Sequence, residues 1–209
     1  MDINIFRSQT GQLQQSFTQL LTQLPKSLHA RALRYKSEQS ALNYVIGRLL
    51  LKRGLEFFGL DNDLEQMEFQ KNGKPVLAEI HFNIAHTDQE VICGFSKEGS
   101  LGLDLEKIKP IEFENFTALF SQKEWTIIKS AADPIRTFYW FWTRKEAIIK
   151  ALGRSLNFLH QIELDASSDQ FITDGKPWFL RDMIAEQNFV GAVCCEAPIG
   201  KLVQHDLNF

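Results

Sequence analysis

The sequence is poor in cysteine and carries charge of nearly balanced sign, and each shortage excludes a class of protein. Its three cysteines are Cys93 and the adjacent pair Cys194 and Cys195. Three thiols cannot all pair with one another, and this spacing matches no zinc motif, so we expect buried, reduced thiols. A net charge of −3 supplies no basic field for a general nucleic-acid binder. We therefore expect no disulfide scaffold and no nucleic-acid partner.

The sequence also lacks a long apolar run and a basic leader. The segment 1–6 has neither the positive start nor the apolar stretch of a signal peptide, and no run is long enough to span a bilayer. With 44% hydrophobic and 23% charged residues, the composition is that of an ordinary globular protein. A length of 209 residues suits one large or two small domains. We expect a soluble, cytoplasmic protein with no membrane partner.

Hydrophobic periodicity predicts a mixture of helices and strands. Apolar residues recur at helical spacing in 12–24, in a helix opened by Pro25, and in 41–58, 113–120, 123–130 and 135–152. Strand-like runs occupy 4–6, expected to be an edge strand, and 82–85, 91–95, 101–106, 162–164, 178–180 and 189–196. This pattern favours an α+β fold.

A weak internal repeat predicts two similar halves. The turn sequence NGKP at 72–75 returns as DGKP at 174–177, and each copy is followed by an apolar strand. The long predicted helices that end near Gly54 and Gly153 are separated by almost the same interval. We therefore expect two α+β halves, 1–99 and 100–209, joined near residues 97–99.

Two short blocks concentrate the chemically active side chains. Residues 102–106 read GLDLE and predict a strand, so Asp104 and Glu106 share one face of it. Residues 142–153 read WTRKEAIIKALG and predict a helix, on which Glu146 and Lys150 are four residues apart and also share a face. Three carboxylates and a lysine of this kind suit a divalent cation and a phosphate, although a plain solvated acidic face would show the same pattern.

Both blocks, in this order and 42 residues apart, resemble the 4′-phosphopantetheinyl transferases. That family carries (V/I/L)-G-(V/I/L)-D-x-E followed by W-x-x-K-E-(A/S)-x-x-K. The resemblance implies a pseudo-two-fold duplicated fold of the larger, Sfp type, with the active site in the cleft between two subdomains, and a monomer. Coenzyme A contacts would come from the first half, and the catalytic residues from the second.

The resemblance also implies a reaction. Phosphopantetheine would pass from coenzyme A to a serine of an apo acyl or peptidyl carrier protein, with release of adenosine 3′,5′-bisphosphate. It implies Mg²⁺ held by Asp104, Glu106 and Glu146, with Lys145 and Lys150 on the pyrophosphate. Lys150 would donate a proton to the leaving group. Glu146, Glu124 or a water on the metal would accept the serine proton.

Further matches place coenzyme A in the first half. The family motif F-N-(I/L/V)-S-H-(S/T) corresponds to 82–87, so the resemblance assigns His86 and Thr87 to the coenzyme A phosphates. A G-K-P turn at 73–75 assigns Lys74 and Pro75 to the adenine side, and Arg31 to the 3′-phosphate. The same tripeptide at 175–177 shows that such a turn also occurs without this role.

Two departures from the family pattern concern coenzyme A binding. Ala85 replaces the usual serine, which removes a hydroxyl worth about 1 kcal/mol. Leu28 replaces the usual lysine near the 3′-phosphate, a place that Lys26, Arg34 or Lys36 could fill.

Two further features have an alternative structural interpretation. Glu124 matches a family F-(S/T)-x-x-E block, but Ser121 and Glu124 also form the S-x-x-E pattern of a helix capping box. The apolar residues between the two motif blocks either dock the carrier protein or pack inward; they are Phe113, Phe116, Leu119 and Phe120.

Two other functions use the same residues. One is a non-catalytic coenzyme A-binding module, and the other is a Mg²⁺-dependent phosphodiesterase. Joint retention of Lys145, Glu146 and Lys150 argues against the first, and the absence of a second acidic cluster argues against the second.

Overall fold

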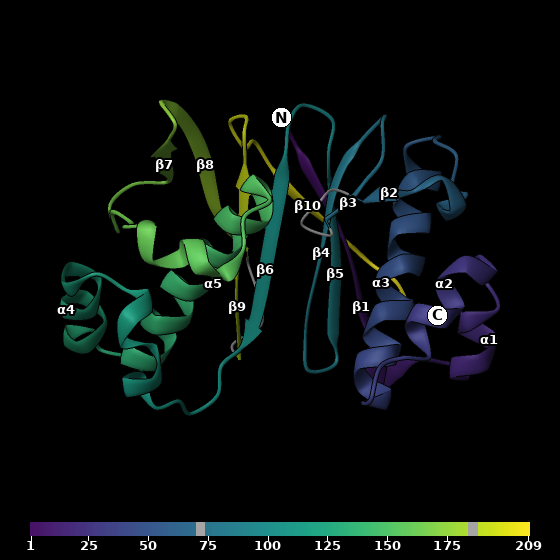
Figure 1. Ribbon diagram of the computed structural model, residues 1–209, viewed down its shortest axis with the longest axis horizontal. Coiled ribbons are helices and arrows are strands. Elements are labelled where there is room, and N and C mark those ends of the chain that lie inside the picture. The colour runs from purple at the N-terminus through teal and green to yellow at the C-terminus, as the bar shows by residue number, and fades with distance from the viewer. Residues whose placement is uncertain (70–73, 184–187) are drawn as a thin grey trace. The chain divides into compact units, whose positions relative to one another are not determined.

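The chain divides into two compact units in a computed structural model that describes residues 1–69, 74–183 and 188–209 (Figure 1). The N-terminal unit comprises Asp2–Lys97 and Lys201–Phe209, and the C-terminal unit comprises Glu98–Gly200 with Met1. The division after Lys97 lies within the segment 97–99, whereas residues 201–209 return to the unit that contains Asp2–Lys97. Gly73, part of the predicted turn, lies outside the described residues.

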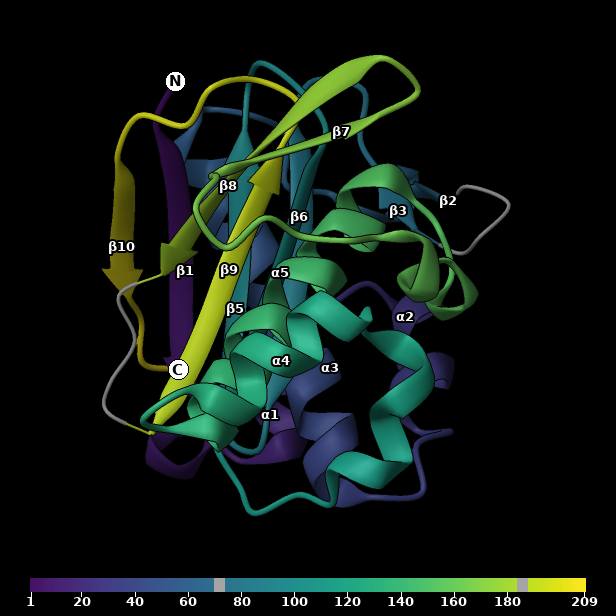
Figure 2. The ribbon, with the colours of Figure 1, turned by 90° about the vertical axis from the view of Figure 1, so that its left-hand side faces the viewer.

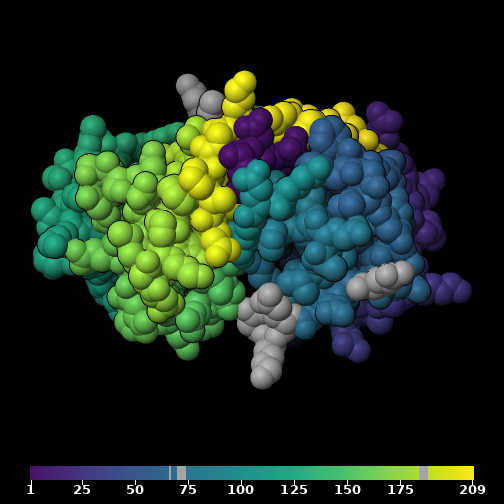
Figure 3. Space-filling model, turned by 90° about the horizontal axis from the view of Figure 1, so that it is seen from above, coloured from purple at the N-terminus to yellow at the C-terminus, as the bar shows by residue number. Residues whose placement is uncertain are grey.

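The N-terminal unit is a sheet with helices on one face. In chain order it contains β1 (Ile3–Gln9), η1 (Thr10–Gln12), α1 (Phe17–Leu21), α2 (Lys26–Ala32), α3 (Glu38–Phe57), η2 (Leu64–Gln66), β2 (Glu68–Phe69), β3 (Pro75–Val76), β4 (His81–Thr87), β5 (Glu90–Ser96) and β10 (Leu202–Asp206). The strand order is β10-β1-β5-β4, in which β10 is parallel to β1 and the other pairs are antiparallel. The purple start and yellow end of the chain are therefore neighbours (Figure 3).

The C-terminal unit repeats this plan. It contains β6 (Leu101–Lys107), η3 (Phe113–Leu119), α4 (Gln122–Ser130), α5 (Pro134–Leu152), η4 (Leu156–Gln161), β7 (Gln170–Thr173), β8 (Lys176–Met183) and β9 (Phe189–Cys195). Its antiparallel sheet has the order β6-β9-β8-β7, and α5 packs against β6 and β9 (Figure 2). The α+β class is confirmed. Three strands have the same order in the two sheets, β1-β5-β4 and β6-β9-β8, whereas the fourth strand pairs with β1 in one sheet and with β8 in the other.

Local chemistry explains the two long helices. Helix α3 begins after Ser37, whose side chain accepts a hydrogen bond from the Ser40 amide. Helix α5 begins after the Asp133 cap with a proline in its first turn, and it ends at Gly153 in the left-handed conformation, with φ of 66°. Each helix buries one apolar side against its own sheet, and these contacts form the two separate cores.

Several predicted elements differ from the structure, and the reasons are tertiary. The strand expected at 4–6 lies inside its sheet, because β10 pairs with its outer edge. The helix expected over 12–24 is limited to α1, which starts only at the Ser16 capping box. Residues 162–164 form no strand, and 113–120 form mainly the 3₁₀ helix η3. Among the described residues, no helix has the length and apolar content needed to cross a membrane.

Candidate active site

The acidic pair Asp104 and Glu106 lies on the face of β6 that is covered by α5. Gly102 shows why the two elements approach so closely, because a Cβ atom at this position would collide with the backbone of Ala147 and Ala151. Residues 102, 104 and 106 alternate with leucines, so all three face the helix. The glycine of the first motif therefore brings the acidic strand into contact with the helix that carries Glu146 and Lys150.

Lys150 and Asp104 form an ion pair, with Nζ 2.6 Å from Oδ1. Asp104 is buried, and 29% of the Lys150 side chain is exposed. Glu146 is also buried, and this burial raises its pKa to about 7. Lys150 opposes the shift, whereas the negative charges of Asp104 and Glu106 add to it. The structure thus brings together four of the predicted residues, and one of them changes protonation near neutral pH.

The carboxylates meet the chemical requirements of a hard cation only in part. Within the described ranges, no three histidine, cysteine, aspartate or glutamate side chains form a ready-made metal group. Magnesium commonly takes only one or two protein carboxylates and fills its other places with water and phosphate oxygens. The mutual repulsion recorded at Glu146 is what a bound cation would relieve. These carboxylates could hold a magnesium ion only together with oxygens of water or of a phosphate.

Lys145 and Glu124 occupy a different place from the one predicted. The Lys145 ammonium is 1% exposed and donates three hydrogen bonds, to Leu119 O at 2.9 Å, Ile162 O at 2.6 Å and Glu124 Oε2 at 2.8 Å. These bonds use all of its donors, so none is left for a pyrophosphate. Burial lowers the pKa of Lys145, and the Glu124 carboxylate opposes that shift.

Glu124 is fully buried, and its interactions are structural. It forms the capping box with Ser121, and its second oxygen accepts the Leu164 amide at 2.9 Å. The capping-box interpretation is confirmed, and this burial keeps Glu124 from any water or substrate hydroxyl. Together Glu124 and Lys145 form a buried ion pair that ties α4 and the segment after η4 to α5.

The residues expected to contact coenzyme A lie in the N-terminal unit. Arg31 is exposed on α2, and its guanidinium lies 5.7 Å from the ring centroids of both Tyr44 and Phe69. Phe69 pairs with Pro75 across the β2-β3 ladder, so the structure brings the end of the predicted G-K-P turn toward Arg31. Lys74, immediately before Pro75, is half-buried.

His86 and Thr87 end strand β4, where His86 is exposed and Thr87 is buried. Ala85, the departure from the family pattern, is buried in the same strand. A serine there would place its hydroxyl in a buried position, and the alanine packs without needing a polar partner.

The predicted docking residues are largely part of the core. Phe120 is buried, while Phe113, Phe116 and Leu119 are partly buried and pack against the C-terminal core. The ring centroid of Phe116 lies 5.0 Å from that of Phe138, a buried residue of α5. Inward packing thus describes most of this cluster, and only edges of its members remain open to a partner.

The comparisons with known proteins agree with the motif blocks. A family model described as the 4'-phosphopantetheinyl transferase superfamily matches residues 100–194, which lie in the C-terminal unit. The 4'-phosphopantetheinyl transferase gsp of Aneurinibacillus migulanus is 32% identical, over 67% of this chain and 60% of its own length. The 4'-phosphopantetheinyl transferase Sfp of Bacillus subtilis is 28% identical, over 78% of this chain and 75% of its own.

A third relative covers more of the molecule. The 4'-phosphopantetheinyl transferase HetI of a Nostoc species is 24% identical over 92% of this chain and 86% of its own length. The matches therefore span between 60% and 86% of these three relatives. The chain belongs to the 4′-phosphopantetheinyl transferase superfamily.

Sequence reasoning missed two residues of these surroundings. Gly102 was visible in the first motif, but only the packed helix reveals its steric role. Arg48 was missed because one arginine in a mostly apolar helix is usually a solvent-facing residue, whereas the structure buries it. A charged residue at a core position of the helical pattern was the clue available.

Proposed function

We propose that this protein transfers phosphopantetheine from coenzyme A to a serine hydroxyl of an acyl or peptidyl carrier protein, releasing adenosine 3′,5′-bisphosphate. The observation that carries the proposal is the cluster of Asp104, Glu106, Glu146 and Lys150 on facing surfaces of β6 and α5. Membership of the superfamily gives that cluster its chemistry. The acceptor hydroxyl belongs to the partner, so this chain needs no nucleophile of its own.

Each member of the cluster has a distinct task in this proposal. A magnesium ion on the three carboxylates would neutralise the pyrophosphate of coenzyme A. Glu146 or a water on the metal would accept the serine proton, because Glu124 is fully buried. Lys150 is the remaining cation of the cluster, since Lys145 is buried, and it would offset charge on the departing phosphate. Asp104 holds the Lys150 ammonium in place.

The N-terminal unit would bind the other end of coenzyme A. Arg31, Lys74, Pro75, His86 and Thr87 form the proposed contact set. Phe69 contacts the Arg31 guanidinium and pairs with Pro75 across the β2-β3 ladder. His86 is exposed to solvent, as a phosphate contact requires. Such a division leaves the reacting phosphate to one set of side chains and the nucleotide to another, and transfer then depends on positioning more than on covalent catalysis.

The decisive experiment is intact-mass analysis of apo carrier proteins incubated with this protein, coenzyme A and Mg²⁺. We expect a gain of one phosphopantetheine group, lost when a chelator is present and in Glu146→Gln. Fatty-acid, polyketide and peptidyl carriers are tested in parallel. If none of them is modified by a preparation that still binds coenzyme A, the transfer reaction is refuted and a non-catalytic binding module remains.

A further inference from the structure

The turn between β4 and β5 has a strained backbone directly after His86 and Thr87. Asp88 has a φ of 48°, in the left-handed region that an aspartate adopts less readily than a glycine does. Asp88 and Gln89 form the whole turn, because Thr87 pairs with Glu90 in the ladder. Such a conformation persists only where the surrounding structure enforces it, and it is most frequent at ligand-binding sites. Contacts from the rest of the N-terminal unit must therefore stabilise this turn.

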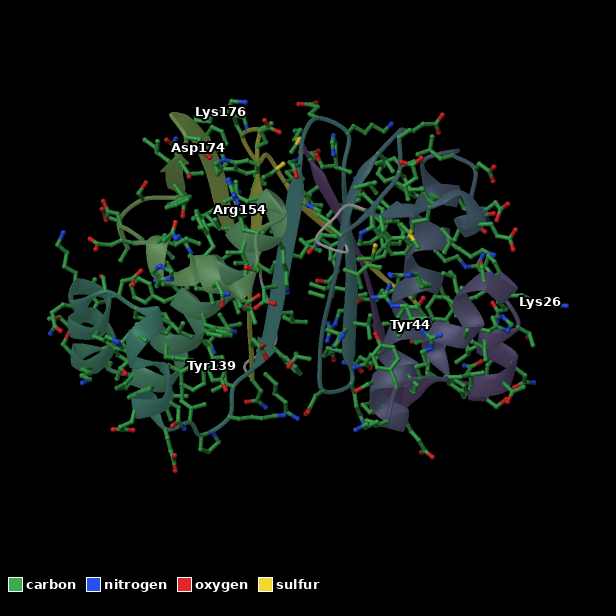
Figure 4. All side chains as sticks on the ribbon, viewed as in Figure 1. Lys26, Tyr44, Tyr139, Arg154, Asp174 and Lys176 are labelled. Carbon is green, nitrogen blue, oxygen red and sulfur yellow. The ribbon has the colours of Figure 1, made fainter. Side chains whose placement is uncertain are left out.

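Asn43 supplies one of these contacts from helix α3. It precedes Tyr44, which is labelled in Figure 4, and Asn43 itself is only 4% exposed. Its Nδ2 donates a hydrogen bond to the carbonyl oxygen of Asp88 at 2.9 Å. Asparagine is less favourable than alanine in a helix interior, so the helix itself gains nothing from this residue. The benefit of Asn43 lies in the turn that it holds.

Two more residues complete the same network. Thr10 donates from its backbone amide and from its Oγ1 to the Gln89 carbonyl oxygen, at 2.8 and 3.2 Å. The Gln39 amide group donates to Thr10 Oγ1 at 2.7 Å and to Asn43 Oδ1 at 2.8 Å. Each bond joins a donor to an acceptor, and Thr10 and Asn43 are buried. A buried network whose members support one another is rigid, and this one fixes both carbonyl groups of the turn.

The rigidity of this turn matters for the two residues that precede it. His86 is exposed and Thr87 is buried, and both belong to the proposed coenzyme A contacts. A ligand is bound more tightly by groups that are already in place, because a mobile turn would have to be ordered when the ligand binds. The hydrogen bond from Asn43 to Asp88 therefore influences affinity without any contact between Asn43 and the ligand.

We propose that Asn43 is a positioning residue for coenzyme A, because it fixes the turn that presents His86 and Thr87 to the phosphates. The identity of the ligand rests on the proposed function, whereas the fixed turn rests on the hydrogen bonds around Asp88. Asn43 then affects the reaction through ligand binding alone. Its loss should raise the KM for coenzyme A and leave kcat unchanged.

Calorimetric titration with coenzyme A, in the absence of metal and carrier protein, tests this role. In Asn43→Ala we expect the dissociation constant to rise about tenfold, which corresponds to the loss of one buried hydrogen bond. Asn62→Ala is the matched control, because it removes an amide that bonds to Glu56 in the same unit, and it should leave the affinity unchanged. Asp88→Gly added to Asn43→Ala should recover most of the lost affinity, because glycine adopts the left-handed conformation without strain. A residue needed only for stability would show no such recovery.

Hydrogen exchange in the ligand-free protein measures the turn separately. The amides of residues 86–90 should exchange faster in Asn43→Ala than in the native protein or in Asn62→Ala. If Asn43→Ala does not fold, Gln39→Ala replaces it, with a smaller loss of affinity in the same direction. The inference is overturned if Asn43→Ala binds coenzyme A as tightly as the native protein does, or if Asp88→Gly restores no affinity.

This inference and the proposed function fail in different ways. Unchanged affinity in Asn43→Ala together with intact transfer would count against the role of Asn43 and not against the proposed function. An affinity that depends on Asn43, together with no transfer to any carrier protein, would count against the proposed function and not against this role.

Discussion

The two units of this protein use one sheet plan for different purposes. Strands β1 and β6 are both seven residues long, and each runs antiparallel to the central strand beside it. Their fourth and sixth residues face the long helix of the same unit. In β6 these are Asp104 and Glu106, and in β1 they are Phe6 and Ser8.

Polarity at those two positions decides what each unit can do. Phe6 belongs to the N-terminal core and stacks on neighbouring rings. Asp104 instead binds Lys150 and raises the pKa of Glu146. The comparison teaches that the fold supplies a strand packed under a helix, while a few side chains at the contact determine whether it becomes core or active site.

The largest expected effect comes from removing the acidic members of that contact. Asp104→Ala or Glu146→Gln should lower the rate of carrier modification on the order of 10³-fold, because charge stabilisation at the reacting phosphate is lost. Rates are measured by intact mass with coenzyme A and Mg²⁺. Ser8→Ala, at the matching place in β1, should keep the native rate. Equal losses in all three variants would mean that the sheet plan and not the acidic contact carries the activity.

The buried ion pair of the C-terminal unit should dominate its stability. Lys145→Met leaves Glu124 as an uncompensated buried charge, and the free energy of unfolding should fall by about 3–5 kcal/mol. Urea denaturation gives the value. Lys123→Met breaks the exposed pair with Glu163 and should leave the free energy of unfolding nearly unchanged. Similar losses in both variants would contradict a structural role specific to Lys145.

Two close helix–strand contacts, at Gly102 and Gly47, should differ in their tolerance of a methyl group. In Gly102→Ala the new methyl group meets the backbone of α5, which cannot move aside, and we expect a loss of about 1–3 kcal/mol with reduced transfer. In Gly47→Ala it meets a methyl group of Ile84 at 2.9 Å, and the better helix propensity of alanine offsets part of the strain. Thermal unfolding compares the variants. A larger loss in Gly47→Ala would reverse this ranking.

The free energy of unfolding should depend on pH through Glu146. The pKa of Glu146 is raised from 4.5 to about 7, so folding favours its protonated form. The resulting destabilisation is absent below about pH 4.5, grows as the pH rises and is complete above about pH 7. Glu146→Gln, which mimics the protonated form, should gain stability at pH 8, up to about 3 kcal/mol, and none at pH 4. The measurement is urea denaturation with chelator present at both values.

Asp182→Asn is the control for Glu146→Gln. The Asp182 side chain is 46% exposed and is already paired with Arg144. If Glu146→Gln gains stability at pH 8 and keeps the same gain at pH 4, the glutamine improves packing and does not act by removing a charge.

The sequence predicted local features well and distant pairings poorly. The strand at β6, the helix α5 and their four polar residues could be predicted because each depends on short-range periodicity. The interior place of β1 could not, since β10, its partner, lies about 200 residues further along the chain. The burial of Lys145 was hidden for a similar reason. Its three acceptors come from Leu119, Glu124 and Ile162, and their spacing in the sequence does not predict that they meet at one ammonium group.

The parallel pairing of β10 with β1 makes the N-terminal unit discontinuous, with the whole of Glu98–Gly200 inserted between its parts. During synthesis, every residue of the inserted unit leaves the ribosome before β10 does. Until then, one edge of β1 exposes unpaired backbone groups that another chain could pair with. This order of emergence leaves that edge open to aggregation until β10 has paired, and faster translation of the codons for β10 would shorten that interval.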